Sequence, residues 1–335
     1  MKMDTITLSH GGGGRKMHEL IDSVFRKEFA DTALDEKKDS AIVNLAGRPI
    51  AFTTDSYVVN PIFFPGGDIG SLAIYGTVND LAVCGARPLY ISAGAVIEEG
   101  FPKKDLLRIV RSMAKAAGKS GVRIVTGDTK VVERGACDRI FINTSGIGEI
   151  YYSGLSQAKI RAGDSLILSG PVGDHAVSIL SKREGIGFST AIKSDSAPLN
   201  ALIRKILGVS KRLRFMRDPT RGGLATTLNE IASGSRFSIA VDEAAVPVRD
   251  GVRQACELLG LDPLYLACEG RVVLVAAQDD ERGILKALRS DKSGRMAAKI
   301  GSITGDYPGK VYLNTIAGGR RILDMLSGEQ LPRIC

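Results

Sequence analysis

The feature that most constrains the fold of this chain is an alternation of short β-branched runs with amphipathic segments, which occurs in two successive blocks. In the first block, the strand-like runs are residues 41–47, 49–55, 88–99, 121–128 and 139–150. The helical segments of this block are residues 15–30, 68–85 and 101–118. Gly47 and Pro49 separate the first two runs, which predicts a pair of adjacent strands, and Gly118 predicts the end of the last helix.

The second block begins near residue 160 and repeats the alternation. Its strand-like runs are residues 162–170, 236–243, 271–278, 296–304 and 310–316. Its helical segments are residues 173–184, 197–207, 224–234, 248–260 and 279–291. Two blocks of mixed strands and helices predict two α/β or α+β domains with a boundary around residues 150–162. Because little apolar content follows Leu326, we expect the end of the chain to be a mobile tail.

Composition excludes several functional classes. The 335 residues carry a formal charge of +8, but the lysines and arginines are scattered among acids, which disfavours a nucleic-acid interface and suits a small polyanionic ligand. The five cysteines show no CxxC pairing, which disfavours a disulfide framework and a zinc site. The first residues lack a secretion signal and no apolar stretch reaches the length of a membrane span, so we expect a cytoplasmic protein with no membrane partner.

A glycine run and four aspartates are candidates for binding a metal-nucleotide. Gly11, Gly12, Gly13 and Gly14 precede a predicted helix, where backbone N–H groups and the helix dipole favour an anion. Asp55, Asp80, Asp128 and Asp218 lie at the ends of apolar runs or in turns. Carboxylates brought together repel each other, and Mg²⁺ with a triphosphate relieves that repulsion. The alternative is that the glycine run is a flexible linker and that the four aspartates are unrelated residues in turns or helix caps.

Two further polar positions and the last residue complete the candidate set. Lys130 follows Asp128 by two residues, so both side chains share one face of an extended strand, which suits phosphate binding, proton transfer or a plain surface ion pair. Glu269 stands in a predicted turn between apolar runs. Cys335 ends the chain, and an exposed thiol there is either an accident of the terminus or the reactive end of a tail.

The motifs SHGGGGRKMHELI, TTDSYVV, GTVNDLAVCGARP, TGDTKVVE, GDHA, DPTRGGL and ACEGR, with a terminal PRIC, together resemble one known family. The chain resembles the HypE family of hydrogenase maturation proteins, within the superfamily of aminoimidazole ribonucleotide synthetase, selenophosphate synthetase and thiamine-monophosphate kinase. The resemblance runs from residue 8 to the last residue. It implies an N-terminal α/β domain whose strands pair across a homodimer, a C-terminal α/β domain, and ATP held between them.

The resemblance also implies a reaction. Family members receive a carbamoyl group on the terminal cysteine from the carbamoyltransferase HypF and use ATP to dehydrate it to a thiocyanate. The cyanide then goes to the Fe(CN)₂CO centre of [NiFe] hydrogenase on a HypC–HypD scaffold. By resemblance, Cys335 is the acceptor, and Lys130 and Glu269 bind and deprotonate the carbamoyl group. Asp55, Asp80, Asp128 and Asp218 would hold Mg²⁺, and Gly11–Gly14 and Thr129 would contact ATP.

The expected organisation is a glycine-rich segment over 1–36, an ATP-binding and dimerisation domain over 37–155, a C-terminal domain over 156–322 and a tail over 323–335. Extended, the residues after Ser327 span up to roughly 30 Å, enough to reach both a partner and the protein's own pocket. Two alternatives stay open. One is a small-molecule kinase or synthetase of the same superfamily, and the other is a non-catalytic carrier of the tail group.

Overall fold

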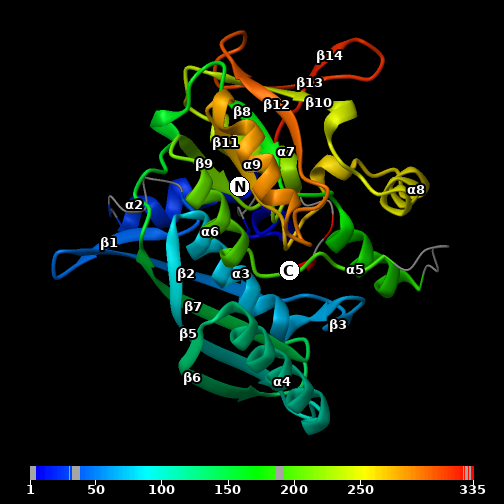
Figure 1. Ribbon diagram of the computed structural model, residues 1–335. Helices are drawn as coiled ribbons and strands as arrows, with labels where there is room; N and C mark the ends of the chain where they lie inside the picture. Colours follow the sequence, from blue (N-terminus) through cyan, green and yellow to red (C-terminus); the bar gives the residue numbers. More distant parts are fainter. Residues whose placement is uncertain are drawn as a thin grey trace.

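A computed structural model describes residues 5–29, 31, 38–185, 192–326, 328, 331 and 333–335 of the chain. Parts of the expected N-terminal segment and tail lie outside these ranges. Figure 1 shows one sheet, built from the first half of the chain, in the lower part of the view and a second sheet, built from the second half, in the upper part. The C-terminus lies between the two sheets, which places the last residue at the junction of the two halves.

The first sheet has five strands in the order β1-β2-β7-β5-β6. Their bounds are β1 (Ala41–Leu45), β2 (Arg48–Tyr57), β5 (Ala86–Glu98), β6 (Arg123–Val132) and β7 (Ile140–Ile150). The pairings are antiparallel except for β5 with β6. The predicted strand pair around Gly47 and Pro49 is confirmed as β1 and β2. A short hairpin that the sequence did not predict, β3 (Phe63–Phe64) with β4 (Gly67–Asp68), precedes the first long helix.

Two helices, α3 (Ile69–Val83) and α4 (Lys103–Ser120), cover one face of this sheet. The helical segment predicted over 68–85 is confirmed by α3, where nearly every residue is buried. Asp68 begins this helix by accepting a hydrogen bond from the Ser71 amide at 2.9 Å. The predicted end of α4 at Gly118 is wrong. The helix continues to Ser120 and stops at Gly121, whose φ of 70° is left-handed, whereas Gly118 stays helical.

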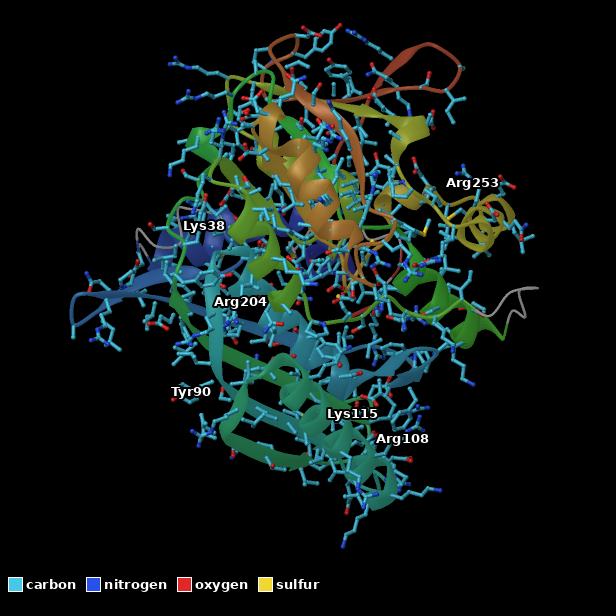
Figure 2. The ribbon with its side chains drawn as sticks, in the orientation of Figure 1. Lys38, Tyr90, Arg108, Lys115, Arg204 and Arg253 are labelled. Atoms are coloured by element: carbon cyan, nitrogen blue, oxygen red, sulfur yellow. The ribbon has the colours of Figure 1, made fainter. Side chains whose placement is uncertain are left out.

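The other face of the first sheet is open and carries apolar side chains. Phe52, Ile147 and Tyr90 lie opposite one another on β2, β7 and β5, and each is about two-fifths exposed. Figure 2 shows Tyr90 at the margin of the lower sheet, apart from Arg108 and Lys115 of α4. Strand β6 forms an edge of the sheet and is exposed along almost its whole length. Apolar side chains on an uncovered sheet face beside an open edge are typical of a surface that a partner covers.

The second sheet has seven strands in the order β14-β13-β10-β12-β8-β11-β9. Their bounds are β8 (Ser165–Leu168), β9 (Leu213–Arg217), β10 (Ser238–Asp242), β11 (Val273–Ala276), β12 (Ala298–Thr304), β13 (Val311–Asn314) and β14 (Arg320–Ile322). Strands β9 and β14 were not predicted. Strand β9 has the sequence LRFMR, and its two arginines disfavour the prediction of a buried strand. The strand is nevertheless largely buried, because Arg214 forms an ion pair with the nearly buried Asp164 at 3.3 Å.

Helices pack on both faces of the second sheet. Their bounds are α5 (Asp174–Glu184), α6 (Asn200–Val209), α7 (Gly223–Ala232), α8 (Asp250–Leu259) and α9 (Glu281–Arg289). Neighbouring residues of the central strands belong to different cores: Leu274 of β11 packs in the core with α6 and α9, and Val275 packs in the core with α7. Helices α5 and α8 contribute instead to a core shared with the first sheet, α3 and Ile334. This shared core joins the two halves and fixes the walls of the site between them.

The N-terminal segment forms a single helical stretch that consists of α1 (Arg15–Leu20), a π-helical turn η2 (Ile21–Phe25) and α2 (Arg26–Phe29). The helix predicted over 15–30 is confirmed as far as Phe29. The apolar side chains of this stretch are not buried as its helical pattern would suggest, because Phe25 is 46% and Phe29 is 66% exposed. Within the described ranges, no helix combines the length and apolar character that crossing a bilayer requires.

Candidate active site

The end of the chain is docked at the junction of the two halves. The Val58 amide donates to the Cys335 carbonyl at 3.2 Å, and the Asn60 amide donates to the Arg333 carbonyl at 3.1 Å. Ile334 is 6% exposed and belongs to the shared core. Arg333 donates to the Val58 carbonyl at 2.9 Å and pairs with Asp138, so its charge is not simply solvated. The structure thus describes a docked position of the tail, and movement away from it stays a prediction.

Cys335 lines a cavity of about 180 Å³. The other walls come from both halves and from the N-terminal glycines, with Gly11, Gly12, Ser56, Arg221 and Ala267 among them. The charge of the terminal residue Cys335 is the main cause that raises the pKa of the Arg221 guanidinium. The same guanidinium lies 3.4 Å from Asp55 Oδ1. The terminal cysteine therefore shares its cavity with a cation and with the glycine run.

The glycine run packs closely against its surroundings. Gly13 has a φ of +78°, and a Cβ there would lie 2.7 Å from Cβ and 2.8 Å from the carbonyl oxygen of Arg221. Gly14 is the N-cap of α1, and a Cβ there would lie 2.5 Å from the Leu326 carbonyl oxygen. Glycine is required at both positions because no side chain fits between the run and the segments it touches. The close approach sets the run directly over Arg221, at the cavity wall.

Three of the four predicted aspartates converge beside this cavity. Asp55 and Asp80 come from the first half of the chain, on β2 and α3, and Asp218 follows β9 of the second half. Thr53 donates to Asp80 Oδ2 at 3.0 Å. Burial raises the pKa of Asp80 well above its usual range, and the nearby Asp218 and Asp55 raise it further. Burial, with repulsion from Asp39, raises the pKa of Asp218 to about 8.

This cluster fits a divalent cation by its chemistry. The raised carboxyl pKa values mean that the nearby cations do not fully compensate the acids, and Arg217 is already held by Asp39 at 3.0 Å and Glu230 at 3.2 Å. Across the described part of the chain, no group of three or more His, Cys, Asp or Glu side chains is placed so that it could by itself hold a metal ion. Mg²⁺ needs no such cage, because it keeps several waters and binds one or two carboxylates plus phosphate oxygens.

The structure does not bring Asp128 and Thr129 into this cluster. Both lie on the exposed edge strand β6, where Lys130 Nζ is 3.0 Å from Asp128 Oδ2. The hydrogen bond from Lys130 lowers the pKa of Asp128. Asp128 and Lys130 line a separate groove, which shares Ser56 and Val58 with the cavity of Cys335. Lys130 therefore lies next to the cavity but does not line it in this chain.

Glu269 lies in the cluster and is buried. Its side chain is near Asp218 and Asp55, and burial followed by repulsion from these two raises its pKa well above the usual range. Its Oε1 atom has no hydrogen-bond partner within the described residues. Because a buried unpaired carboxyl oxygen is costly, it commonly marks a group with a chemical role. Glu269 does not itself line the cavity of Cys335, but Ala267, two residues before it, does, and the charges of Glu269 and Cys335 both act on Arg221.

Sequence reasoning missed two residues that organise this site. Arg221 lies in the quoted DPTRGG motif, but an arginine three residues after an aspartate resembles a surface ion pair. Asn79 precedes Asp80, accepts from the Leu199 amide at 2.8 Å and donates to the carbonyls of Ala197 and Glu269 at 3.1 and 3.3 Å. It ties α3 to the Glu269 turn. The dipeptide Asn79-Asp80 in the GTVND motif could have indicated Asn79 as a site residue, but the sequence pattern pointed only to Asp80 as a candidate ligand.

The comparison with known proteins agrees with this arrangement. Residues 37–150 match the AIR synthase related protein, N-terminal domain, and residues 161–314 match the corresponding C-terminal domain. The chain is 51% identical over 337 residues to the carbamoyl dehydratase HypE of Cupriavidus necator, covering 100% of this chain and 96% of that protein. This chain belongs to the HypE family. It is also 45% identical to the Escherichia coli HypE over 339 residues, covering 99% and 100% of the two chains.

Solved structures of the HypE family share the fold. A HypE chain from a crystal structure of a HypE–HypF complex is 47% identical, with a TM-score of 0.86, and the match covers 92% of this chain and 99% of that chain. HypE in complex with ATP is 50% identical, with a TM-score of 0.83 and coverage of 99% and 100%. AaThiL complexed with AMPPCP and TMP, at 17% identity and a TM-score of 0.69, shares the fold alone.

Proposed function

We propose that this protein is an ATP-dependent carbamoyl dehydratase that acts on its own C-terminus. It converts an S-carbamoyl group on Cys335 into a thiocyanate, and the cyanide supplies the Fe(CN)₂CO centre of [NiFe] hydrogenase. The observation that carries the proposal is the seat of Cys335 in a cavity bounded by the glycine run and Arg221, beside the buried acids. We further propose that residues 37–155 and 156–322 are the two domains that hold ATP, with residues 1–36 before them and the tail 323–335 after them.

The reaction balances in two steps. The amide oxygen of the thiocarbamate attacks the γ-phosphorus of ATP and ADP leaves, which turns a poor leaving group into a phosphate ester. The NH₂ group gives up both of its protons, the first as the phosphate ester forms and the second to a base as the carbon–oxygen bond breaks, and inorganic phosphate departs to leave S–C≡N. The net change is the loss of one water from the thiocarbamate and the conversion of ATP to ADP and phosphate.

Each residue of the site has a role in this scheme. Gly11–Gly14 present backbone N–H groups to the phosphates. Arg221 offers positive charge to the docked terminus and to the developing phosphate ester. Glu269, in its ionised form, takes the second nitrogen proton; burial and repulsion from Asp218 and Asp55 raise its pKa, which makes the carboxylate a stronger base. Lys130 and Asp128 line the adjacent groove, from which Lys130 would contact the seated carbamoyl group, and Thr129 lies between them on β6, where it would contact ATP.

Asp55, Asp80 and Asp218 are the residues that would hold Mg²⁺, and Asp128 is the fourth candidate from the neighbouring groove. When bound, the ion neutralises charge on the transferring phosphoryl group. The chain's own contribution is to keep three carboxylates together through burial, through Thr53 at Asp80, and through the shared core that joins the two halves.

Partners follow from the same reading. We propose that HypF loads the carbamoyl group, because a chain of this fold is solved in a HypE–HypF complex, and that a HypC–HypD scaffold receives the cyanide.

We also propose a homodimer in which the open face of the first sheet, with Phe52, Tyr90 and Ile147, is covered by a second copy. Light scattering tests this: Tyr90→Asp should give a monomer if that face forms the interface.

Intact-mass analysis tests the proposed activity. The protein is loaded by carbamoyl-charged HypF, freed of ATP, and then given ATP. The expected result is the loss of one water from the C-terminal peptide, with one ADP formed for each. Cys335→Ser is the control and should neither gain the carbamoyl group nor consume ATP in step with it. ATP turnover that persists in Cys335→Ser would indicate a small-molecule kinase, and loading without water loss would indicate a carrier.

A further inference from the structure

The docked tail is held by groups from both halves of the molecule. The first half binds the carbonyls of Cys335 and Arg333 through the backbone amides of Val58 and Asn60. The second half binds the Arg333 carbonyl through Arg183 Nη2 at 2.8 Å and the Ile334 carbonyl through His175 Nε2 at 2.8 Å. The Ile334 carbonyl belongs to the peptide bond that carries Cys335. A contact at this atom therefore controls where the reactive residue sits.

His175 is built for this contact. It is fully buried on the first turn of α5 and packs edge-on against Phe64, with ring centroids 5.5 Å apart. Its Nδ1 atom lies 2.8 Å from Ser194 Oγ. Since a carbonyl only accepts, Nε2 must carry the proton that is donated to Ile334. Ser194 Oγ accepts from the Ser196 amide at 3.0 Å, which leaves its own hydrogen for Nδ1 and selects this tautomer.

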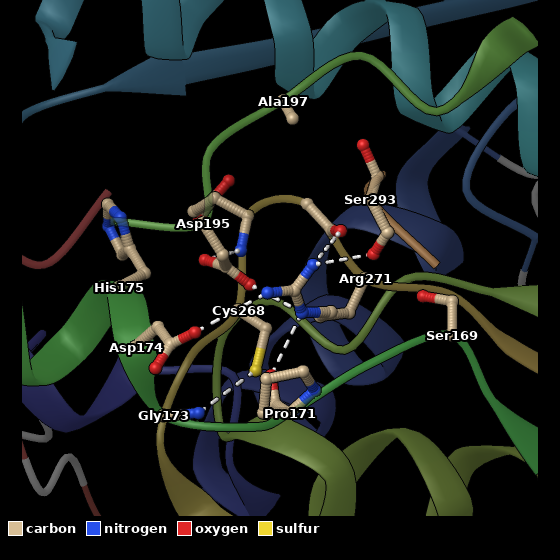
Figure 3. Close-up of polar contacts among 12 residues, drawn as sticks. Ser169, Pro171, Gly173, Asp174, His175, Asp195, Ala197, Cys268, Arg271 and Ser293 are labelled. Carbon is tan, nitrogen blue, oxygen red and sulfur yellow. Dashed lines mark hydrogen bonds and ion pairs between the residues drawn. The ribbon is translucent and has the colours of Figure 1, made fainter. Parts of the chain in front are cut away.

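A buried ion network keeps His175 and Ser194 in place. Arg271 lies 3.4 Å from Asp174 and 3.3 Å from Asp195, the residues adjacent to His175 and Ser194. All three network side chains are less than a tenth exposed. Figure 3 shows His175 beside this network, with the Arg271 guanidinium to one side of both aspartates and in contact with them. Asp195 also accepts from the Glu269 amide at 3.1 Å, so the same network orients the turn that carries the proposed base.

We propose that His175, oriented by Ser194, is a positioning residue that holds the Ile334 carbonyl and thereby seats Cys335 in the cavity. The reaction needs the thiocarbamate held in one place, whereas loading by a partner needs the tail released. A single neutral hydrogen bond suits both needs, because its loss shifts the ratio of docked to undocked tail by about five- to tenfold without making either state inaccessible. Burial lowers the pKa of His175, which is consistent with a neutral ring.

Carboxypeptidase Y digestion of the full-length protein tests the contact without reference to activity. This protease cleaves the Ile334–Cys335 bond, whose carbonyl His175 holds, so the initial rate of cysteine release reports the undocked fraction. His175→Leu should release Cys335 about five- to tenfold faster than wild type. His175→Gln restores an N–H donor and should release it at close to the wild-type rate. Ser194→Ala should fall between wild type and His175→Leu, and provides a second variant should the leucine substitution impair folding.

Ser178→Ala is the matched control. Ser178 is buried on the same helix and donates to the His175 carbonyl at 2.9 Å, but it does not touch the tail. Its release rate should equal that of wild type. The proposal is overturned if His175→Leu and Ser194→Ala, both folded by circular dichroism, lose Cys335 no faster than Ser178→Ala.

A dehydration assay is the second measurement. It rests on the proposed function, and it distinguishes a failure of that function from a failure of the positioning role of His175. In single-turnover dehydration of the carbamoylated protein, His175→Leu should slow water loss because the seated thiocarbamate loses its fixed orientation, should leave the KM for ATP within twofold, and should accept the carbamoyl group at least as fast as wild type. If wild type shows no water loss at all, the proposed function fails, and the protease result still decides the role of His175. Equal slowing of loading and dehydration would contradict the positioning role.

Discussion

The glycine run can be tested by adding a single methyl group at Gly13. Its φ of +78° is left-handed, which costs an alanine about 1–2 kcal/mol. The new Cβ would also lie 2.7 Å from the Arg221 side chain and 2.8 Å from its carbonyl oxygen, far inside ordinary contact. The run must therefore move away from Arg221 in Gly13→Ala, and it has to recover the strained position to close over ATP.

The expected magnitude follows from that strain. If the run returns to its position only on binding ATP, a strain of about 2 kcal/mol appears as a roughly 30-fold loss of affinity. Isothermal titration with a non-hydrolysable ATP analogue measures the loss directly. The melting temperature should change little, because the run precedes the folded halves and can shift without exposing their core.

Gly47→Ala is the control for backbone strain alone. Gly47 has a φ of +83° in the β1–β2 turn, and a Cβ there would meet nothing within 4 Å. This variant should lose about 1 kcal/mol of stability and bind the analogue normally. The reasoning is refuted if Gly13→Ala binds within threefold of wild type, or if Gly47→Ala weakens binding as strongly.

Three further predictions concern the acids and the lysine. Glu269→Gln should slow single-turnover water loss at least about 100-fold while leaving carbamoyl loading intact, and differential scanning fluorimetry should show no loss of stability, because the amide replaces a carboxyl whose ionisation burial disfavours. A pKa of about 8 for Asp218, raised from 3.8, means that the folded protein binds this proton more tightly than the unfolded chain, so without metal the stability falls as pH rises from about 4 to 8. Urea titrations in EDTA should show a smaller fall in Asp218→Asn than in wild type, and parallel curves would contradict the shift. Lys130→Gln should change stability by less than about 0.5 kcal/mol, because its pair with Asp128 is exposed, yet slow dehydration at least tenfold; unchanged dehydration would leave it a surface ion pair.

The order and type of most elements could be predicted from the sequence because each depends on residues close together in the chain. The apolar run through α3 and the alternation in β2 show burial directly. Prediction failed where a long-range contact outweighs the local pattern. Strand β9 carries arginines whose charges are neutralised by acids from other segments, and α4 ends at the glycine whose backbone turns left-handed rather than at the first glycine available.

The candidate site divides in the same way. Cys335, the glycine run and the aspartates could be selected from the sequence, because residue type and a nearby turn already limit their chemistry. Which of them meet was decided by the tertiary structure: Asp55, Asp80 and Asp218 converge, and Asp128 stays on an edge strand. The contact of His175 with Ile334 spans 159 positions in the chain. No local pattern encodes such a contact, because it exists only after the shared core has packed the two halves together and has drawn the buried Ile334 between them.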